Sequence, residues 1–265
     1  MDINISVDAS ANRKVWDKYS EEYQQTHGSQ LSKLGSSWGV WSIPESDMNV
    51  LGPVKGKKIL ELGCGAAQWS IALHKQGGIL TGIDNSKKQL EKAAELLKEN
   101  NIDFPLIHCS AESTPFENQT FDIVFCDHGA MSFSPTLPTL FEVNRVLKTG
   151  GLFVFNVQSP LHEICYDTEK NTVNTSLHRS HFDLKRSVDE ENGMVYFPQS
   201  HSQWIKNFRR SGFQILDLTE IQAPADAESS YTEYVSHEWA RLWPAEDIWK
   251  LRKESDTPPP LTSNF

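Results

Sequence analysis

The chain has 265 residues, 38% hydrophobic and 23% charged, which is enough to bury a sizeable core. Its formal net charge of −10 at pH 7 argues against a surface dedicated to nucleic acid, because phosphate binding needs clustered lysine and arginine. No run of eighteen apolar residues predicts a membrane span, and the N-terminus lacks the features of a signal peptide. Four cysteines without metal-ligand spacing favour a reducing, cytoplasmic location.

Residues 1–50 are predicted to form an N-terminal arm that is polar but rich in aromatic side chains. Trp16 and Tyr23 lie on one face of a helix expected over about residues 12–25. A loop that contains Trp38 follows. These aromatic residues either cover an apolar edge of the core or form a lid over a ligand. In the second interpretation Tyr23 and Trp38 are expected to contact a bound cofactor.

From residue 51 onward, strand patterns alternate with helix patterns. Because helix-sized intervals separate the strands, we expect parallel βαβ units. The predicted fold is therefore α/β, with a doubly wound, mostly parallel, seven-stranded Rossmann-like sheet and helices on both faces. The predicted strands are 59–62, 79–84, 104–109, 121–126, 152–157, 194–197 and 213–218.

The same pattern divides the chain into three parts. Residues 1–50 are the arm, and residues 51–220 are the Rossmann-like domain. Within that domain, residues 159–193 lose the strand–helix rhythm and are interpreted as an insertion after the fifth strand. Residues 221–265 are expected to form a C-terminal tail, with a disordered Pro-rich end from residue 257.

A glycine turn between the first strand and its helix is the feature around which this pattern is organised. The strand runs into G-C-G-A-A at residues 63–67, and glycine lets the backbone come close to a ligand because it has no Cβ. A dinucleotide site needs a third glycine, but that place holds Gln68. Glu61, just ahead of the turn, would also face a pyrophosphate unfavourably. Both features point away from a dinucleotide, and Glu61 would suit a ligand that carries an ammonium and a sulfonium in place of phosphates.

The run E-L-G-C-G-A-A at residues 61–67, followed by G-I-D-N-S at 82–86, resembles the signature of class I S-adenosylmethionine-dependent methyltransferases. The resemblance covers about residues 57–157, and its ordered spacing is more specific than a lone glycine motif. It is strongest to the small-molecule branch related to quinone-biosynthesis enzymes, and it departs from the pattern where Ala67 replaces the last glycine. Further motifs follow in order: S-A-E at 110–112, P-F at 115–116, F-D-I-V-F at 121–125 and R-V-L-K-T-G-G at 145–151.

This resemblance implies S-adenosylmethionine as the cofactor and S-adenosylhomocysteine as the product. Asp84 would accept hydrogen bonds from both ribose hydroxyls, for which a carboxylate is suited, and Glu61 would lie near the amino group. The alternatives are that Asp84 caps a helix and that Glu112 is a solvated loop acid. The other implied residues are Gly63, Cys64 and Gly65 in the turn, Asn85 and Gln89 beside the adenosine, Ala111 and Glu112 at the adenine, and Asp127 near the methyl group.

Methyl transfer from a sulfonium needs the nucleophile to be aligned and water to be excluded, and it needs no metal. A base is required only if the nucleophile must lose a proton, and His128, after the fourth strand, is the candidate. Its alternative is a hydrogen-bonded loop histidine without chemistry. No metal site is expected: of His178, His181 and His201, only His178 and His181 are locally spaced to share an ion, and no neighbouring acid completes that pair convincingly.

We therefore expect a methyltransferase that acts on a small-molecule acceptor. We expect no nucleic-acid partner and no membrane span. The alternatives are an RNA or protein methyltransferase, a non-catalytic S-adenosylmethionine-binding protein, a dinucleotide oxidoreductase, and a decarboxylase or cyclase on the same fold. The sequence leaves the acceptor, the methylated atom and the oligomeric state open.

Overall fold

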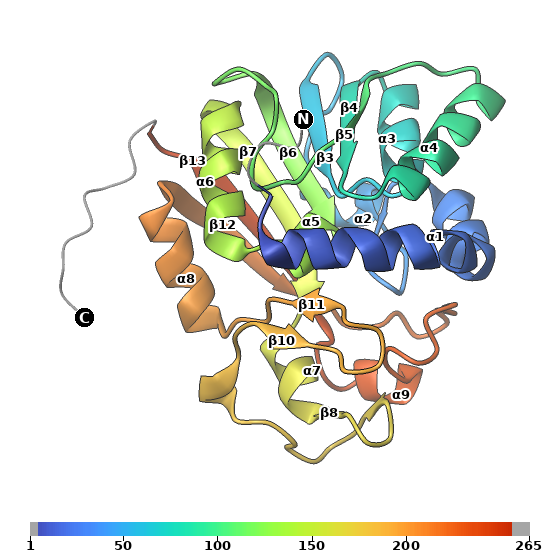
Figure 1. Ribbon diagram of the computed structural model, residues 1–265, viewed down its shortest axis with the longest axis vertical. Helices are drawn as coiled ribbons and strands as arrows, with labels where there is room; N and C mark the ends of the chain where they lie inside the picture. Colours follow the sequence, from blue (N-terminus) through green and yellow to red (C-terminus); the bar gives the residue numbers. More distant parts are fainter. Residues whose placement is uncertain (1–4, 256–265) are drawn as a thin grey trace.

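A seven-stranded sheet forms the centre of the computed structural model, which describes residues 5–255 (Figure 1). The strand order is β12-β13-β7-β6-β3-β4-β5; neighbours from β7 to β5 pair in parallel, and β13 is antiparallel to both its neighbours. The predicted fold class is thus confirmed. The strands are β3 (Lys58–Leu62), β4 (Ile79–Asp84), β5 (Leu106–His108), β6 (Phe121–Asp127), β7 (Leu147–Gln158), β12 (Phe213–Glu220) and β13 (Glu246–Lys253).

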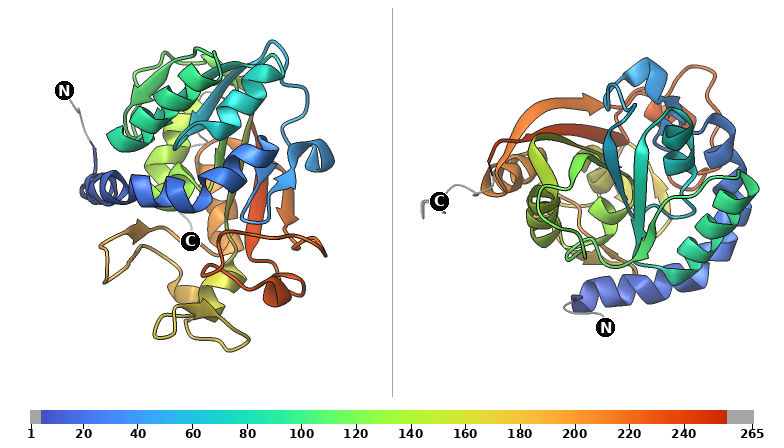
Figure 2. Two further views of the ribbon diagram at one scale, coloured as in Figure 1. Left: turned by 90° about the vertical axis from the view of Figure 1, so that its right-hand side faces the viewer. Right: turned by 90° about the horizontal axis from the view of Figure 1, so that it is seen from above.

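Helices cover both faces of this sheet, as the two views of Figure 2 show. The helices α3 (Gln68–Lys75) and α4 (Lys87–Glu99) contribute to one buried apolar cluster, and α6 (Thr136–Val146) and α8 (His201–Arg210) contribute to the other. The central strands β3 and β6 are buried on both faces, which explains why they read as continuous apolar runs in the sequence.

The N-terminal helix α1 (Val7–Leu34) is longer than the segment 12–25 that periodicity predicted. Its N-cap, Ser6, accepts a hydrogen bond from the Ala9 amide, and the helix ends at Gly35, where φ is +69°. The helix lies between the central sheet and the segment that contains β8 to β11 (Figure 1). The helix therefore packs against other elements along much of its length. The sequence did not reveal its full extent, because the helix is only weakly amphipathic.

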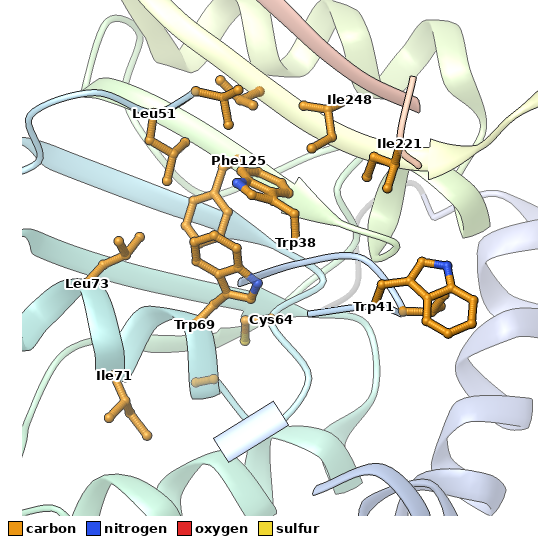
Figure 3. Close-up of a cluster of buried hydrophobic side chains, with 14 of the residues drawn as sticks. Trp38, Trp41, Leu51, Cys64, Trp69, Ile71, Leu73, Phe125, Ile221 and Ile248 are labelled. Atoms are coloured by element: carbon orange, nitrogen blue, oxygen red, sulfur yellow. The ribbon is translucent and has the colours of Figure 1, made fainter. Parts of the chain in front are cut away.

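The aromatic residue Trp38 lies in the core, which corrects its expected role as a lid contact (Figure 3). Its ring centroid lies 4.7 Å from that of Trp69 and 6.5 Å from that of Phe125. Its indole N–H donates to Glu45 Oε2 at 2.7 Å, which satisfies its polar atom inside the protein. Trp38 therefore covers an apolar edge of the sheet, the first of the two interpretations of the aromatic arm.

Two segments differ from the predicted strand assignment. Residues 246–253, placed in a C-terminal tail by the sequence pattern, form β13 inside the central sheet. The predicted strand 194–197 is reduced to β11 (Val195–Tyr196), which pairs with β10 (Ser187–Val188) outside that sheet. The count of seven strands holds because β13 takes the place given to 194–197. Strand β13 was missed because its polar start and alternating charges resemble a solvated segment.

The remaining elements are short and connect or cover the main ones. None of the helices among residues 5–255 is long and apolar enough to cross a membrane. The expected disordered end from residue 257 lies outside the described residues. The short elements are β1 (Ser37–Trp38), β2 (Ile43–Pro44), α2 (Glu45–Met48), α5 (Ala130–Phe133), α7 (Pro160–Cys165), β8 (Tyr166–Asp167), β9 (Thr172–Val173), a 3-10 turn (His181–Asp183) and α9 (His237–Ala240).

Candidate active site

A pocket with about 740 Å³ of empty space lies at the carboxyl ends of β3, β4 and β6, under α1. The chain order reverses between β3 and β6, and open α/β sheets bind their ligands in the crevice at such a point. Most of the residues singled out from the sequence come together here. Those that line the pocket are Tyr23, Gly63, Gly65, Asp84, Asn85, Gln89, Ala111, Asp127 and His128.

The two glycines of the turn have different structural roles. Both have positive φ, +68° at Gly63 and +53° at Gly65, which favours glycine on conformational grounds. A Cβ on Gly63 would lie 2.6 Å from the backbone nitrogen of Ala130, so this glycine lets the loops after β3 and β6 meet. A Cβ on Gly65 would meet only the Gln89 side chain, at 3.8 Å, so this glycine leaves the pocket floor open.

Asp84, at the end of β4, fixes the glycine turn to the next loop. One carboxylate oxygen accepts from the Gly65 amide at 2.9 Å, and the other accepts from the Ser86 amide at 2.7 Å. Burial raises the pKa of Asp84 to about 6, although these two amide hydrogen bonds oppose the shift. The N-cap of α4 is Ser86, whose hydroxyl accepts from the Gln89 amide, so Asp84 is not the cap of this helix.

Glu61 is buried beside the pocket and does not line it. Its carboxylate accepts from the Ser70 amide at 3.2 Å and from the Ser70 hydroxyl at 2.5 Å, which ties β3 to α3. Burial raises the pKa of Glu61 to about 8, because its contacts with Ser70 offset the desolvation only in part. The sequence interpretation placed Glu61 near the cofactor's amino group. The structure instead shows Ser70 as its hydrogen-bond partner.

Two other expected cofactor contacts also lie outside the pocket lining. Cys64 is buried against the sheet, where a Cβ on Gly82 would lie 2.9 Å from its sulfur, and burial raises the pKa of its thiol. Glu112 accepts hydrogen bonds from the Ser6 amide at 3.3 Å and the Ser6 hydroxyl at 3.1 Å. Glu112 is therefore neither a solvated loop acid nor a pocket wall; it holds the start of α1.

Asp127, at the end of β6, joins the pocket to the loop of the N-terminal arm. Its carboxylate accepts from the Gly39 amide at 3.2 Å, the Trp69 indole at 3.3 Å and the Asn156 amide at 2.8 Å. Burial raises the pKa of Asp127 despite these contacts and the nearby charge of His128. An acid with a raised pKa at the pocket wall is stabilised in its ionised form when a cation binds beside it.

His128 follows Asp127 and adopts a positive φ of +50°. Its Nε2 lies 2.5 Å from Oε1 of Glu246, the first residue of β13. Burial alone would lower the pKa of His128, but the hydrogen bond and charge of Glu246 outweigh it and raise the pKa above its ordinary value. Glu246 was missed in the sequence because it lies in the segment taken for a tail, and its only signal is an acid next to an apolar run.

Residues 60–155 match the family described as "Methyltransferase domain". The chain carries a class I S-adenosylmethionine-dependent methyltransferase domain. A demethylmenaquinone methyltransferase from Listeria welshimeri is 27% identical over 232 residues, which cover 84% of this chain and 89% of that protein. A second, from Staphylococcus haemolyticus, is 43% identical over 103 residues, or 37% of this chain and 42% of that protein.

Solved methyltransferases share the fold at low sequence identity. A putative S-adenosylmethionine-dependent methyltransferase from Listeria monocytogenes matches with a TM-score of 0.63 and 18% identity, over 80% of this chain and 96% of that one. The [4+2]-cyclase SpnF matches with a TM-score of 0.65 and 16% identity, over 95% and 98%. At such low identities the similarity establishes the fold alone, and the reactions of these proteins are not transferred to this chain.

S-adenosylmethionine is the cofactor of this methyltransferase domain, and the residues at the pocket suit it. The open floor at Gly65 admits a ligand against the backbone. The carboxylates of Asp84 and Asp127, both with raised pKa values, line the pocket and favour a ligand that carries positive charge. A phosphate-bearing ligand would be repelled by the same groups.

Several pocket residues of the methyltransferase domain and its arm were not predicted. The Trp16 ring stands edge-on to Phe133, with centroids 5.2 Å apart, and Tyr23 donates to or accepts from Tyr231 at 2.7 Å between hydroxyl oxygens. Burial raises the pKa of Tyr23 to about 12. The helical periodicity of the arm placed Trp16 on the same face as Tyr23. Nothing in the sequence indicated that α5 and its neighbouring residues would line the pocket. These additional lining residues are Ala9, Asn12, Trp16, Ile83, Cys109, Ser110, Gly129, Ala130, Phe133 and Ser134.

One histidine has acid neighbours that the sequence did not reveal. His201 lies 2.7 Å from Asp247, and Glu220 is close enough for the three side chains to offer ligand atoms within 4.8 Å of one another. The sequence reasoning considered acids only around His178 and His181, so this cluster was not predicted. The three residues come from α8, β12 and β13, and none of them lines the pocket. This cluster is separate from the methyl-transfer site.

Proposed function

We propose that the protein transfers the methyl group of S-adenosylmethionine to a small-molecule acceptor bound under α1. The observation that carries this proposal is that the pocket has two kinds of wall. Asp84 and Gly65 offer hydrogen-bonding groups and open backbone, whereas Trp16, Tyr23 and Phe133, whose rings contact one another, form an aromatic wall. A pocket with a few convergent polar groups beside aromatic side chains is typical of a small-molecule site.

A planar aromatic acceptor fits this aromatic wall best, because flat rings stack or pack edge-on against aromatic side chains. Relatives that match 84% of this chain are named demethylmenaquinone methyltransferases, a name that indicates a quinone-type acceptor for those proteins. We therefore propose an acceptor of the quinol or phenol class. The net charge of −10 gives no support to an RNA acceptor.

The predicted site residues that line the pocket have specific tasks in this proposal. Asp84 accepts hydrogen bonds from the ribose, Gly63 and Gly65 let the turn pass under the cofactor, and His128 takes a proton from the acceptor. S-adenosylmethionine supplies the activated methyl group when bound. The chain's own part is to align the acceptor, exclude water with α1, and provide the base. The remaining proposed contacts are Asn85, Gln89 and Ala111 at the adenosine and Asp127 near the methyl group.

The test is an incubation of the purified protein with S-adenosylmethionine and a panel of acceptors. The panel holds 1,4-dihydroxynaphthalene, a short-chain demethylmenaquinol, catechol and an aliphatic thiol, with bulk RNA and a denatured protein mixture as macromolecular controls. Mass spectrometry follows S-adenosylhomocysteine and the methylated product. We expect both to form in equal amounts with a ring hydroxyl compound. Product with RNA or protein alone would overturn the small-molecule assignment.

Two further outcomes correspond to the remaining alternatives. Cofactor binding without S-adenosylhomocysteine from any acceptor would favour a non-catalytic binding protein. Conversion of an acceptor without S-adenosylhomocysteine would favour a decarboxylase or cyclase, a class that the fold of the [4+2]-cyclase SpnF shows is compatible with this architecture. Binding of NADH in place of S-adenosylmethionine would instead indicate an oxidoreductase.

We also propose that the arm of residues 1–50 acts as a lid through α1, and that the protein works in the cytoplasm. The first part is supported by the α1 side chains Trp16 and Tyr23 in the pocket wall. The second is supported by the buried thiols of Cys64 and Cys126, which a reducing compartment would preserve. Protease protection of α1 by S-adenosylhomocysteine, and fractionation of cells, are the respective measurements.

A further inference from the structure

A buried glutamate controls the orientation of His128. Glu246 begins β13 and its side chain is fully buried, yet its carboxylate reaches the edge of the pocket. Oε1 contacts His128 Nε2 at 2.5 Å and accepts from the Asn156 amide at 2.9 Å. A buried carboxylate is costly unless it is well hydrogen-bonded, so this convergence of donors is a specific arrangement and not an incidental surface pair.

The contact with Glu246 decides which ring nitrogen of His128 carries the proton. A carboxylate accepts hydrogen bonds, so the neutral imidazole must place its N–H on Nε2. Nδ1 is then the unprotonated nitrogen, and it has no hydrogen-bond partner among residues 5–255. The His128 side chain is 25% exposed and lines the pocket, and Nδ1 is the ring nitrogen that Glu246 leaves free to meet an acceptor.

The same carboxylate binds the N-terminal arm. The Val40 amide donates to both oxygens of Glu246, at 3.1 and 3.2 Å. At the neighbouring Gly39, where φ is +69°, an added Cβ would lie 2.4 Å from Oε1 of Glu246. The Gly39 amide itself donates to Asp127. The loop after α1 thus fits against the two carboxylates that flank His128, and it keeps Glu246 in place.

We infer that Glu246 is a positioning residue that holds His128 with Nδ1 as the base, for an acceptor whose reacting group carries an ionisable hydroxyl. This inference rests on the proposed function and names the substrate class of the same site. A phenol or an enol meets the requirement. An amine or thioether acceptor would not need the arrangement, because its lone pair is available without loss of a proton.

The proton and the electrons balance without any further reagent. The acceptor's O–H bond breaks, its proton goes to Nδ1 of His128, and the resulting oxyanion or its conjugated ring carbon supplies the electron pair for the new bond to methyl. The broken carbon–sulfur bond leaves its electron pair on sulfur. The imidazolium is stabilised by Glu246 until it returns the proton to water, as a carboxylate does for histidine in other acid–base pairs.

The titratable groups that face His128 come from several elements. Asp127 precedes it on β6, and Glu246 approaches it from β13. The Tyr234 ring stands edge-on to the imidazole at 5.8 Å between centroids. His162, from α7, stacks on the Tyr234 ring, and its Nε2–H donates to the Tyr234 carbonyl at 3.1 Å; burial lowers the pKa of His162 to about 4, so it stays neutral. Glu246 and Asp127 are therefore the charges that act on His128.

The test is NMR of the full-length protein labelled with ¹⁵N-histidine, with the His128 signals assigned from their loss in His128→Asn. In the wild-type protein the neutral His128 is expected to carry its proton on Nε2. Glu246→Gln preserves the shape but removes the charge, and should lower the pKa of His128 by about 1–3 units. A proton on Nδ1 in the wild-type protein, which needs no variant to measure, would overturn the inference.

Asp247→Asn is the matched control. Asp247 is the next residue of β13, is equally buried, and contacts another histidine, His201, at 2.7 Å. Because successive strand residues point to opposite faces, this change lies on the far side of the sheet. It should leave the tautomer and the pKa of His128 unchanged. An equal shift in Glu246→Gln and Asp247→Asn would mean a general loss of structure, and the positioning role would fail.

An activity measurement separates this inference from the proposed function. With 1,4-dihydroxynaphthalene as acceptor, Glu246→Gln should lower kcat at least tenfold and leave the KM for S-adenosylmethionine within about twofold. The rising limb of the pH–rate profile of Glu246→Gln should move to lower pH, because neutral His128 is the active form and its pKa is lowered in this variant. If no acceptor is methylated, the proposed function fails while the NMR result still decides the tautomer. If Glu246→Gln methylates the acceptor and the rising limb of its pH–rate profile is unshifted, the positioning role of Glu246 is wrong and the proposed methyltransferase function still holds.

Discussion

The sharpest prediction concerns Asp84 and the affinity for the cofactor. Asp84→Asn keeps the size of the side chain but removes its charge and one of its acceptor oxygens. In the native site both oxygens already accept a backbone N–H, from Gly65 and Ser86. The new amide group must therefore point an N–H at one of these donors, and the ribose loses a charged partner. The change should weaken binding without removing the pocket.

The magnitude follows from the hydrogen bonds involved. A hydrogen bond to a charged group contributes about 1.5–3 kcal/mol, and Asn retains one neutral acceptor, so we expect a loss of about 2–4 kcal/mol. That corresponds to a Kd increased about 30- to 1,000-fold. Isothermal titration calorimetry with S-adenosylhomocysteine measures it directly.

The pKa of about 6 at Asp84 adds a pH signature. Ligand binding favours the carboxylate, so the pKa of Asp84 falls in the complex and binding releases a proton when the pH is below about 6. Wild-type affinity should therefore decrease as the pH falls through 6, by about tenfold at pH 5. Asp84→Asn should lack this component. Because Glu61 and Asp127 also have raised pKa values, the difference between the two proteins is the relevant quantity.

The control is Asp122→Asn, at the amino end of β6, where Asp122 accepts from the Lys58 amide and pairs with Lys148. It should alter stability slightly and leave cofactor affinity unchanged. Two results would refute the reasoning. One is an Asp84→Asn affinity within threefold of the wild-type value. The other is an identical pH slope for both proteins.

Three other changes test separate parts of the structure. Gly63→Ala should lower the free energy of unfolding in urea by more than about 2 kcal/mol, because its Cβ would lie 2.6 Å from the backbone of Ala130. Gly65→Ala should lower it by only about 1 kcal/mol but should weaken cofactor binding. Equal effects of the two variants would contradict the different roles given to the two glycines. His128→Ala should lower turnover and keep cofactor affinity, so unchanged turnover would reduce it to a scaffold residue. Asn12→Ala breaks three hydrogen bonds to Phe133 and Val195 and should cost about 3 kcal/mol of unfolding free energy; a loss below 0.5 kcal/mol would show that α1 is held elsewhere.

The sequence by itself determined the parallel strands of the sheet and most of the predicted residues that line the pocket. The βαβ units from β3 to β7 are built from neighbouring segments, so their periodicity and turn glycines are local signals. The spacing from Gly63 to Asp84 reflects one strand, one helix and one further strand, and the structure brings both residues to the same pocket. Local chain geometry is sufficient for this part.

Only the tertiary structure decided the rest, because it depends on pairing between distant segments. Strand β13 enters the sheet by hydrogen bonds to β7, about ninety residues earlier, and no periodicity in residues 246–253 names that partner. Its insertion brings Glu246 to His128, which is the contact on which the proposed base depends. Likewise Glu112 meets Ser6 and Trp38 meets Trp69 across the fold. A residue's type records which contacts it can make, and the packed chain determines which of them it does make.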